Sequence, residues 1–136
     1  MIGYQQILVP IDGSELSHMA VKQSSYIAQK FDSTITLLMV ENSDYEQIFD
    51  STEELEEIDH EVLIEASKLL EKNINYKMAI LKGNPKHTII NYAKKNQVEL
   101  IVIGATGASR LSEILIGSTT EYIVNHAICN VFIVKQ

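Results

Sequence analysis

Five short apolar runs alternate with stretches of helical periodicity, and this alternation limits the possible folds of the chain more than any other feature. The runs cover residues 7–11, 35–40, 76–81, 99–103 and 131–135, with helical patterns between them. Continuous apolar runs are typical of strands buried on both faces, and strands joined through helices form parallel sheets. The sequence therefore predicts a single doubly wound α/β domain over residues 1–136. The pattern alone leaves the strand order open.

Local signals mark where the helices begin. Ser14 suits an N-cap for the first helix, and Asn84-Pro85 places a proline in the first turn of the third. Residues 51–54 match the Ser-x-x-Glu capping box, and so do Ser118 and Glu121. The fourth helix, predicted over 118–126, is therefore expected to satisfy its own first N–H groups.

The net charge of −7 is concentrated in one segment of the 136-residue chain. Residues 41–71 carry twelve acids and one base, which leaves six acids and ten bases elsewhere. A solvated acidic helix face explains such a run, and no cluster of basic residues favours nucleic-acid binding. We therefore expect no nucleic-acid partner.

Residues with catalytic or metal-binding chemistry are scattered. The single cysteine, Cys129, comes just before the apolar closing run, in a context that indicates a buried and inert thiol. The four histidines have no partner at metal-ligand spacing, and no nucleophile–base pair or carboxylate dyad stands out. The N-terminus has no basic leader and the chain has no long apolar span, so we expect a cytoplasmic protein without a membrane partner.

One motif does indicate binding chemistry. Residues 104–107 read Gly-Ala-Thr-Gly directly after a predicted strand, and nine residues later Gly117 precedes Ser118, Thr119 and Thr120. We expect Gly104 and Gly107 to take positive φ and to let a ligand approach the backbone. Hydroxyls and N–H groups at a helix start favour an anion, so the two donor sets are predicted to hold a phosphate from two sides.

The two common phosphate signatures are absent. The chain contains neither Gly-x4-Gly-Lys-Ser/Thr nor Gly-x-Gly-x-x-Gly. A plain turn followed by a self-capped helix, with no ligand at all, therefore stays open as an alternative.

The combined pattern Gly-x2-Gly-x9-Gly-Ser resembles the nucleotide-binding signature of the universal stress protein family. Residues 7–14 resemble that family's opening strand and turn, 103–124 its loop and helix, and 126–134 its closing strand. The resemblance implies a Rossmann-like, adenine nucleotide alpha hydrolase-like sheet in the order 3-2-1-4-5. In that order, the turns after Ile11 and Ile103 face each other at the topological switch, where open α/β sheets bind ligands.

The resemblance also implies a set of ligand contacts. It implies ATP as the ligand, with Mg or Mn, and a role for Asp12 on the nucleotide, although Asp12 could also only cap the first helix. It assigns Val40 to the adenine, with Pro10 as an apolar wall. Together with Gly104, Gly107, Gly117, Ser118, Thr119 and Thr120, the loop residue Arg110 is a candidate phosphate contact, with simple exposure as the alternative.

This chain departs from the family pattern in two places. Ala105 and Thr106 stand where many members have a serine followed by a basic or polar residue. Ile128 and Asn130 flank the cysteine where the family favours prolines. The first departure removes one hydroxyl and one charge from the expected phosphate loop.

Three functions fit these observations. The first is a small ATP-binding stress-response protein that signals through nucleotide occupancy. A slow ATPase or autophosphorylating enzyme, and a nucleotide-free interaction module, are the alternatives. The resemblance implies a homodimer through the last strand, whose apolar residues 131–134 would otherwise leave an uncovered sheet edge.

Overall fold

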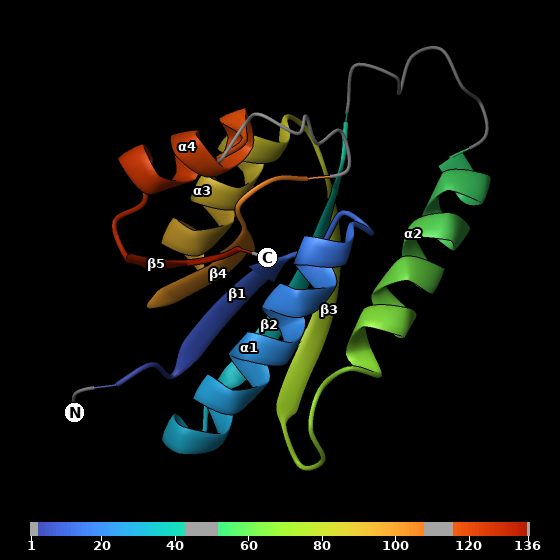
Figure 1. Cartoon of the computed structure of the whole chain (residues 1–136). Helices are drawn as coiled ribbons and strands as arrows, with labels where there is room; N and C mark the ends of the chain where they lie inside the picture. The colour runs from blue at the N-terminus through green and yellow to red at the C-terminus, as the bar shows by residue number, and fades with distance from the viewer. Residues whose placement is uncertain (1–2, 43–51, 108–115, 136) are drawn as a thin grey trace.

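The chain forms one five-stranded parallel sheet in this computed structural model, which describes residues 3–42, 52–107 and 116–135 and omits the side chains of 52–59. The strands are Gln6–Pro10 (β1), Thr34–Glu41 (β2), Asn75–Lys82 (β3), Leu100–Gly104 (β4) and Asn130–Val134 (β5). Their order is β3-β2-β1-β4-β5, and each neighbouring pair is parallel (Figure 1). The doubly wound α/β fold and the implied strand order are confirmed.

The helices are Glu15–Phe31 (α1), Thr52–Ser67 (α2), Pro85–Lys95 (α3) and Ser118–His126 (α4). The predicted Ser14 cap is confirmed, because its hydroxyl accepts from the N–H of Ser17, and so is the proline in the first turn of α3. The Asn84 side chain caps α3 by accepting from the N–H of Lys86. The predicted cap at Ser51 lies outside the described residues.

Two hydrophobic cores lie on opposite faces of the sheet. Figure 1 shows α1 and α2 on one side, and α3 and α4 on the other. Because successive strand side chains point to opposite faces, β1 contributes Ile7 and Val9 to the α1–α2 core and Leu8 to the α3–α4 core. Full burial of each such side chain stabilises the fold by roughly 1.5–3 kcal/mol. The central strands therefore hold the turns that follow them in fixed positions.

The two outer strands differ from the central ones in exposure. All of β4 is buried, whereas β3 has six exposed positions out of eight and β5 alternates from Asn130, exposed, to Val134, buried. Phe132 of β5 is 40% exposed and Ile128, just before the strand, is 76% exposed. The closing strand therefore presents apolar side chains at the edge of the sheet.

No helix in the described part of the chain combines the length and apolarity needed to cross a membrane.

Candidate functional site

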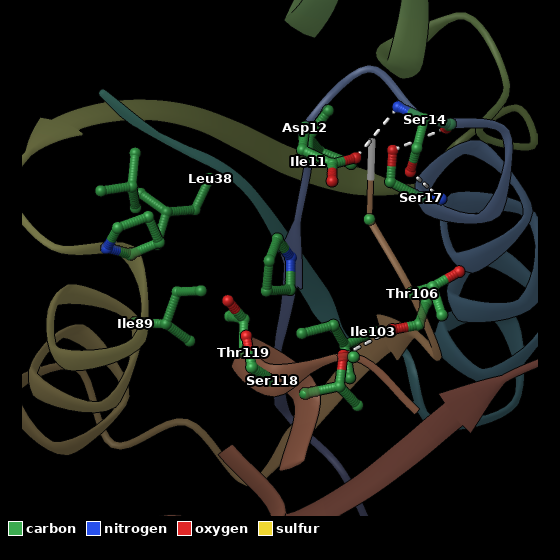
Figure 2. A pocket seen from close by; sticks show the side chains of 17 residues that line it. Ile11, Asp12, Ser14, Ser17, Leu38, Ile89, Ile103, Thr106, Ser118 and Thr119 are labelled. Carbon is green, nitrogen blue, oxygen red and sulfur yellow. Dashed lines mark hydrogen bonds between the residues drawn. The ribbon is translucent and has the colours of Figure 1, made fainter. Parts of the chain in front are cut away.

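A pocket of about 410 Å³ opens at the carboxyl ends of β1 and β4 (Figure 2). These two strands are neighbours in the sheet but not in sequence, so the pocket lies at the topological switch. Nine of the ten predicted site residues line it: Pro10, Asp12, Val40, Gly104, Gly107, Gly117, Ser118, Thr119 and Thr120. The tenth, Arg110, lies outside the described residues.

The turn after β1 brings the Asp12 carboxylate against the turn after β4. Its Oδ1 accepts a hydrogen bond of 2.9 Å from the N–H of Ser14. Its Oδ2 lies so close to Gly107 that a Cβ on this glycine would be 2.5 Å from the oxygen. Asp12 therefore stabilises the turn between β1 and α1 and also lines the pocket, so its local hydrogen bond does not remove it from the pocket wall.

Gly104 and Gly107 are glycines because a side chain would clash with a neighbour, and not because the backbone takes a conformation that only glycine favours. The prediction that Gly104 and Gly107 take positive φ is wrong, since the positive-φ glycines of the described chain are Gly3, Gly13 and Gly83. A Cβ on Gly104 would lie 2.9 Å from the Cβ of Leu16 on α1. Close packing between β4 and α1 therefore explains this glycine, as the Asp12 carboxylate explains Gly107.

The start of α4 faces the pocket without a side-chain cap. Gly117 is the N-cap, with an extended backbone (φ −73°, ψ 165°) and no side-chain hydrogen bond to the first turn. The predicted capping box of Ser118 and Glu121 is therefore wrong, because Ser118 is the first helical residue and not the cap. Helix starts leave their first N–H groups without helical partners, and those of α4 lie beside the pocket-lining residues Ser118 and Thr119 (Figure 2).

Backbone hydrogen bonds fix the position of this helix start. The N–H of Gly117 donates to the carbonyl of Ala105 over 2.7 Å, and the N–H of Ala105 donates to the carbonyl of Val134 over 2.8 Å. The buried Thr120 hydroxyl donates to the carbonyl of Gly104 over 2.8 Å. The hydroxyl proton of Thr120 is therefore already used in a hydrogen bond within the protein. Only the backbone N–H of Thr120 could donate to a ligand.

Apolar residues form the other wall of the pocket. Sequence reasoning identified Pro10 and Val40 there, but it missed Ile11, Leu38, Pro85, Ile89 and Ile103. Strand ends of a doubly wound sheet converge on one edge, so Ile103 and Leu38 could have been inferred from the strand order. Pro85 and Ile89 belong to α3, and their place in the pocket depends on how α3 packs on the sheet. Ser14 and Ser17 were also missed.

Thr106 is a further lining residue that the sequence marked only as a departure from the pattern. It is 7% exposed, and its Oγ1 has no hydrogen-bond partner among the described residues. A buried hydroxyl without a partner is costly, by roughly 1–3 kcal/mol on mutational scales. A ligand that satisfied this group would recover that cost.

Asp12 is the one charged side chain among the described residues that line the pocket. The described residues include no group of three acidic, histidine or cysteine side chains able to hold a metal. A hard cation such as Mg²⁺ is commonly held through one or two carboxylates together with phosphate oxygens and water.

The thiol and the imidazoles lie outside the pocket lining. Cys129 is half-buried, and desolvation raises the pKa of its thiol above the ordinary value. The expectation that this cysteine is fully buried is therefore wrong. The raised pKa disfavours the thiolate, which is the nucleophilic form. The four histidines lie on the four helices, as predicted, and His60, His87 and His126 are exposed.

Comparisons with known proteins agree with this architecture. Residues 3–135 match the sequence model of the universal stress protein family. The chain is 32% identical to the universal stress protein MJ0531 of Methanocaldococcus jannaschii, over 98% of this chain and 83% of that one.

Solved structures share the fold over nearly the whole chain. The universal stress protein UspA from Lactobacillus plantarum superposes with a TM-score of 0.85 at 31% identity, over 98% of this chain and 99% of that one. A universal stress protein from Archaeoglobus fulgidus, solved in complex with dAMP, gives a TM-score of 0.76 at 19% identity, over 98% and 100%.

Proposed function

Because this chain belongs to the universal stress protein family, we propose that its pocket binds an adenine nucleotide, and that the ligand is ATP with Mg²⁺ or Mn²⁺. The fold accommodates such a ligand, since the Archaeoglobus fulgidus protein was solved with dAMP. Bound ATP would change which partners the protein contacts. The nucleotide would then act as a signal and would not need to be hydrolysed.

The uncapped start of α4 is the observation that carries this proposal. α1 and α3 satisfy a first-turn N–H with the side chains of Ser14 and Asn84, whereas the N-cap of α4 is a glycine, which has no side chain for this role. The helix dipole favours an anion at this end. The partnerless Thr106 hydroxyl in the same pocket is a second polar group that a phosphate oxygen would satisfy.

The apolar wall suits the base of the nucleotide. Leu38 and Val40 lie in the last half of β2, and Pro85 and Ile89 of α3 line the same pocket. Flat apolar contact on both faces of a purine, with a few polar groups to orient it, is the usual composition of such sites. We assign the adenine to this wall and the phosphates to the α4 start, with the ribose near Asp12.

Asp12 is the proposed carboxylate for the ribose or the cation. Asp12 follows β1, lies against Gly107 and lines the pocket, which supports a role for its carboxylate oxygens in ligand binding. Mg²⁺ or Mn²⁺ would supply charge neutralisation for the phosphates when bound. The role of Asp12 is then to orient the phosphate–cation pair toward the α4 start.

We further propose that the protein is a homodimer through β5. The exposed side chain of Phe132 and the half-buried side chain of Ile133 lie on an edge strand, where a second copy could pair antiparallel in a closed two-fold arrangement.

Direct identification of the ligand tests the main proposal. Protein purified without added nucleotide is denatured, and the released small molecules are identified by mass spectrometry. Titration calorimetry of ligand-stripped protein with ATP, AMP and GTP, each with and without Mg²⁺, then ranks the ligands. Preference for adenine nucleotides supports the proposal, whereas no release and no binding heat would contradict it. Measuring ADP over one turnover separates a binder from an ATPase.

A further inference from the structure

Four side chains form a cluster between α3 and α4, outside the pocket lining. The Tyr122 hydroxyl lies 3.0 Å from Nδ1 of His87, and the two rings meet edge to face. The His126 ring stacks on the Tyr122 ring, with centroids 3.9 Å apart and planes 16° apart. The ammonium of Lys86 lies over the Tyr122 ring, 5.2 Å from its centroid. Because the His126 ring already covers one face of the Tyr122 ring, we assign the Lys86 ammonium to the other face.

The two faces of the Tyr122 ring point in opposite directions along α4. Ser118, Tyr122 and His126 are four residues apart, so their side chains lie one above another on the same side of the helix. His126 follows Tyr122 and occupies the ring face toward the C-terminal end. A cation over the other face lies on the side of Ser118, about 5.4 Å along the axis for one helical turn. The Lys86 ammonium is thus held in the direction of the α4 start.

Charge gives this position a consequence for the pocket. Asp12, an acid, is the one charged side chain among the described lining residues, so that lining offers no positive charge to a polyphosphate. Lys86 immediately follows Pro85, which does line the pocket. No carboxylate of the described residues forms an ion pair with Lys86, so its charge is not neutralised there.

From these contacts we infer that Lys86 binds the phosphates of the nucleotide, with Tyr122 as the platform that keeps its ammonium near the α4 start. This inference rests on the proposed function and adds a residue to it. An ammonium held over an aromatic face is attracted to the ring but keeps its N–H donors for an anion. Lys86 would then make the site select ligands by phosphate charge, with ATP above AMP and AMP above adenosine.

Binding of three ligands to paired variants tests this role. Lys86→Met removes the ammonium and keeps an unbranched apolar stem. Lys94→Met makes the same change in the last turn of the same helix, at an exposed residue remote from the pocket. Titrations with ATP, AMP and adenosine are done in EDTA, so that no divalent cation shares the phosphate charge. We expect Lys86→Met to weaken ATP roughly tenfold or more, as for loss of a charge-assisted hydrogen bond. Adenosine should change less than about twofold, within the scatter for a surface change.

Each possible result supports or overturns a distinct claim. Equal ATP affinity in Lys86→Met and Lys94→Met would overturn the inference and leave the proposed function standing. An equal loss for ATP and adenosine would also overturn it, because Lys86 would then only support the pocket wall. If the wild-type protein binds none of the three ligands, in EDTA or with Mg²⁺, the proposed function fails and the inference fails with it. Recovery of ATP affinity in Lys86→Arg, which restores the charge, is the confirming result.

Discussion

The Asp12 carboxylate and Gly107 are in such close contact that no residue other than glycine fits at position 107 without moving the acid. A Cβ there would lie 2.5 Å from Oδ2, well inside normal contact distance. The contact joins the turn after β1 to the turn after β4, the two turns between which the pocket opens.

Gly107→Ala should therefore act through Asp12. The added methyl group displaces the carboxylate, and we expect ATP to bind about as weakly as in Asp12→Ala. A double-mutant cycle measured by calorimetry checks this, because residues in contact give non-additive effects. Additive losses would mean that Gly107 serves the ligand independently of Asp12.

Asp12→Ala should weaken ATP binding by about 1–3 kcal/mol, the usual cost of leaving a polar partner unpaired. Asp12→Asn separates the two roles of this residue, since its amide oxygen can still accept from the N–H of Ser14. We expect Asp12→Asn to keep the thermal stability of the wild type while it loses the Mg²⁺-dependent part of ATP affinity. Wild-type affinity in both variants would reduce Asp12 to a cap of α1.

Gly117→Val should abolish nucleotide binding in a folded protein. A Cβ at position 117 would meet its nearest neighbours, the Ala105 carbonyl oxygen and the Thr106 Cα, at 3.6 Å, which is ordinary contact distance. The backbone there is extended at negative φ, so a side chain causes no strain, but its branches would fill the space at the α4 start. Unfolding curves and ATP titrations are measured on the same preparation, and unchanged affinity would remove the phosphate site from this place.

Thr120→Val should lower the free energy of unfolding by about 1–3 kcal/mol, because it leaves the buried Gly104 carbonyl without its donor. Urea denaturation without nucleotide measures the loss. Thr119→Val is the matched variant, at a half-buried neighbour with no hydroxyl hydrogen bond among the described contacts, and it should change stability by less than about 0.5 kcal/mol. Equal losses in the two variants would contradict the structural role of Thr120.

Ile133→Lys should convert the proposed dimer to a monomer. Ile133 is half-buried on β5, and it is a better test site than Val131, which packs against the α3–α4 core. Tyr76→Lys, at an exposed residue of β3 on the opposite edge of the sheet, serves for comparison. Sedimentation equilibrium at micromolar concentration gives the masses. A wild-type monomer of 15.3 kDa would show that β5 is not a dimer interface.

The sequence predicted those parts of the fold that depend on local pattern. Apolar runs located all five strands to within about two residues, Ser14 is the predicted N-cap of α1, and Asn84-Pro85 marks the start of α3 as predicted. The strand order came from the family resemblance, because periodicity describes which residues a strand buries but not which strand lies next to it.

The incorrect predictions all depend on contacts between residues distant in sequence. Ser118 and Glu121 have the right spacing for a capping box, yet the N-cap is Gly117, whose N–H is bound to the distant Ala105 carbonyl. Gly104 and Gly107 were expected to provide positive φ, but each provides space, for Leu16 and for Asp12. Neither partner can be identified from the sequence surrounding the glycine.

Ala105 connects the start of α4 to the end of β5 through its two backbone groups. Its carbonyl accepts from the N–H of Gly117, the N-cap of α4, and its N–H donates to the carbonyl of Val134, the last residue of β5. A ligand that stabilises one of these hydrogen bonds would thereby also act on the other. Thermodynamic linkage makes the coupling free energy between two binding sites the same in both directions. A second copy that docks on β5 would change the affinity for nucleotide by the same factor by which nucleotide changes the affinity for that copy.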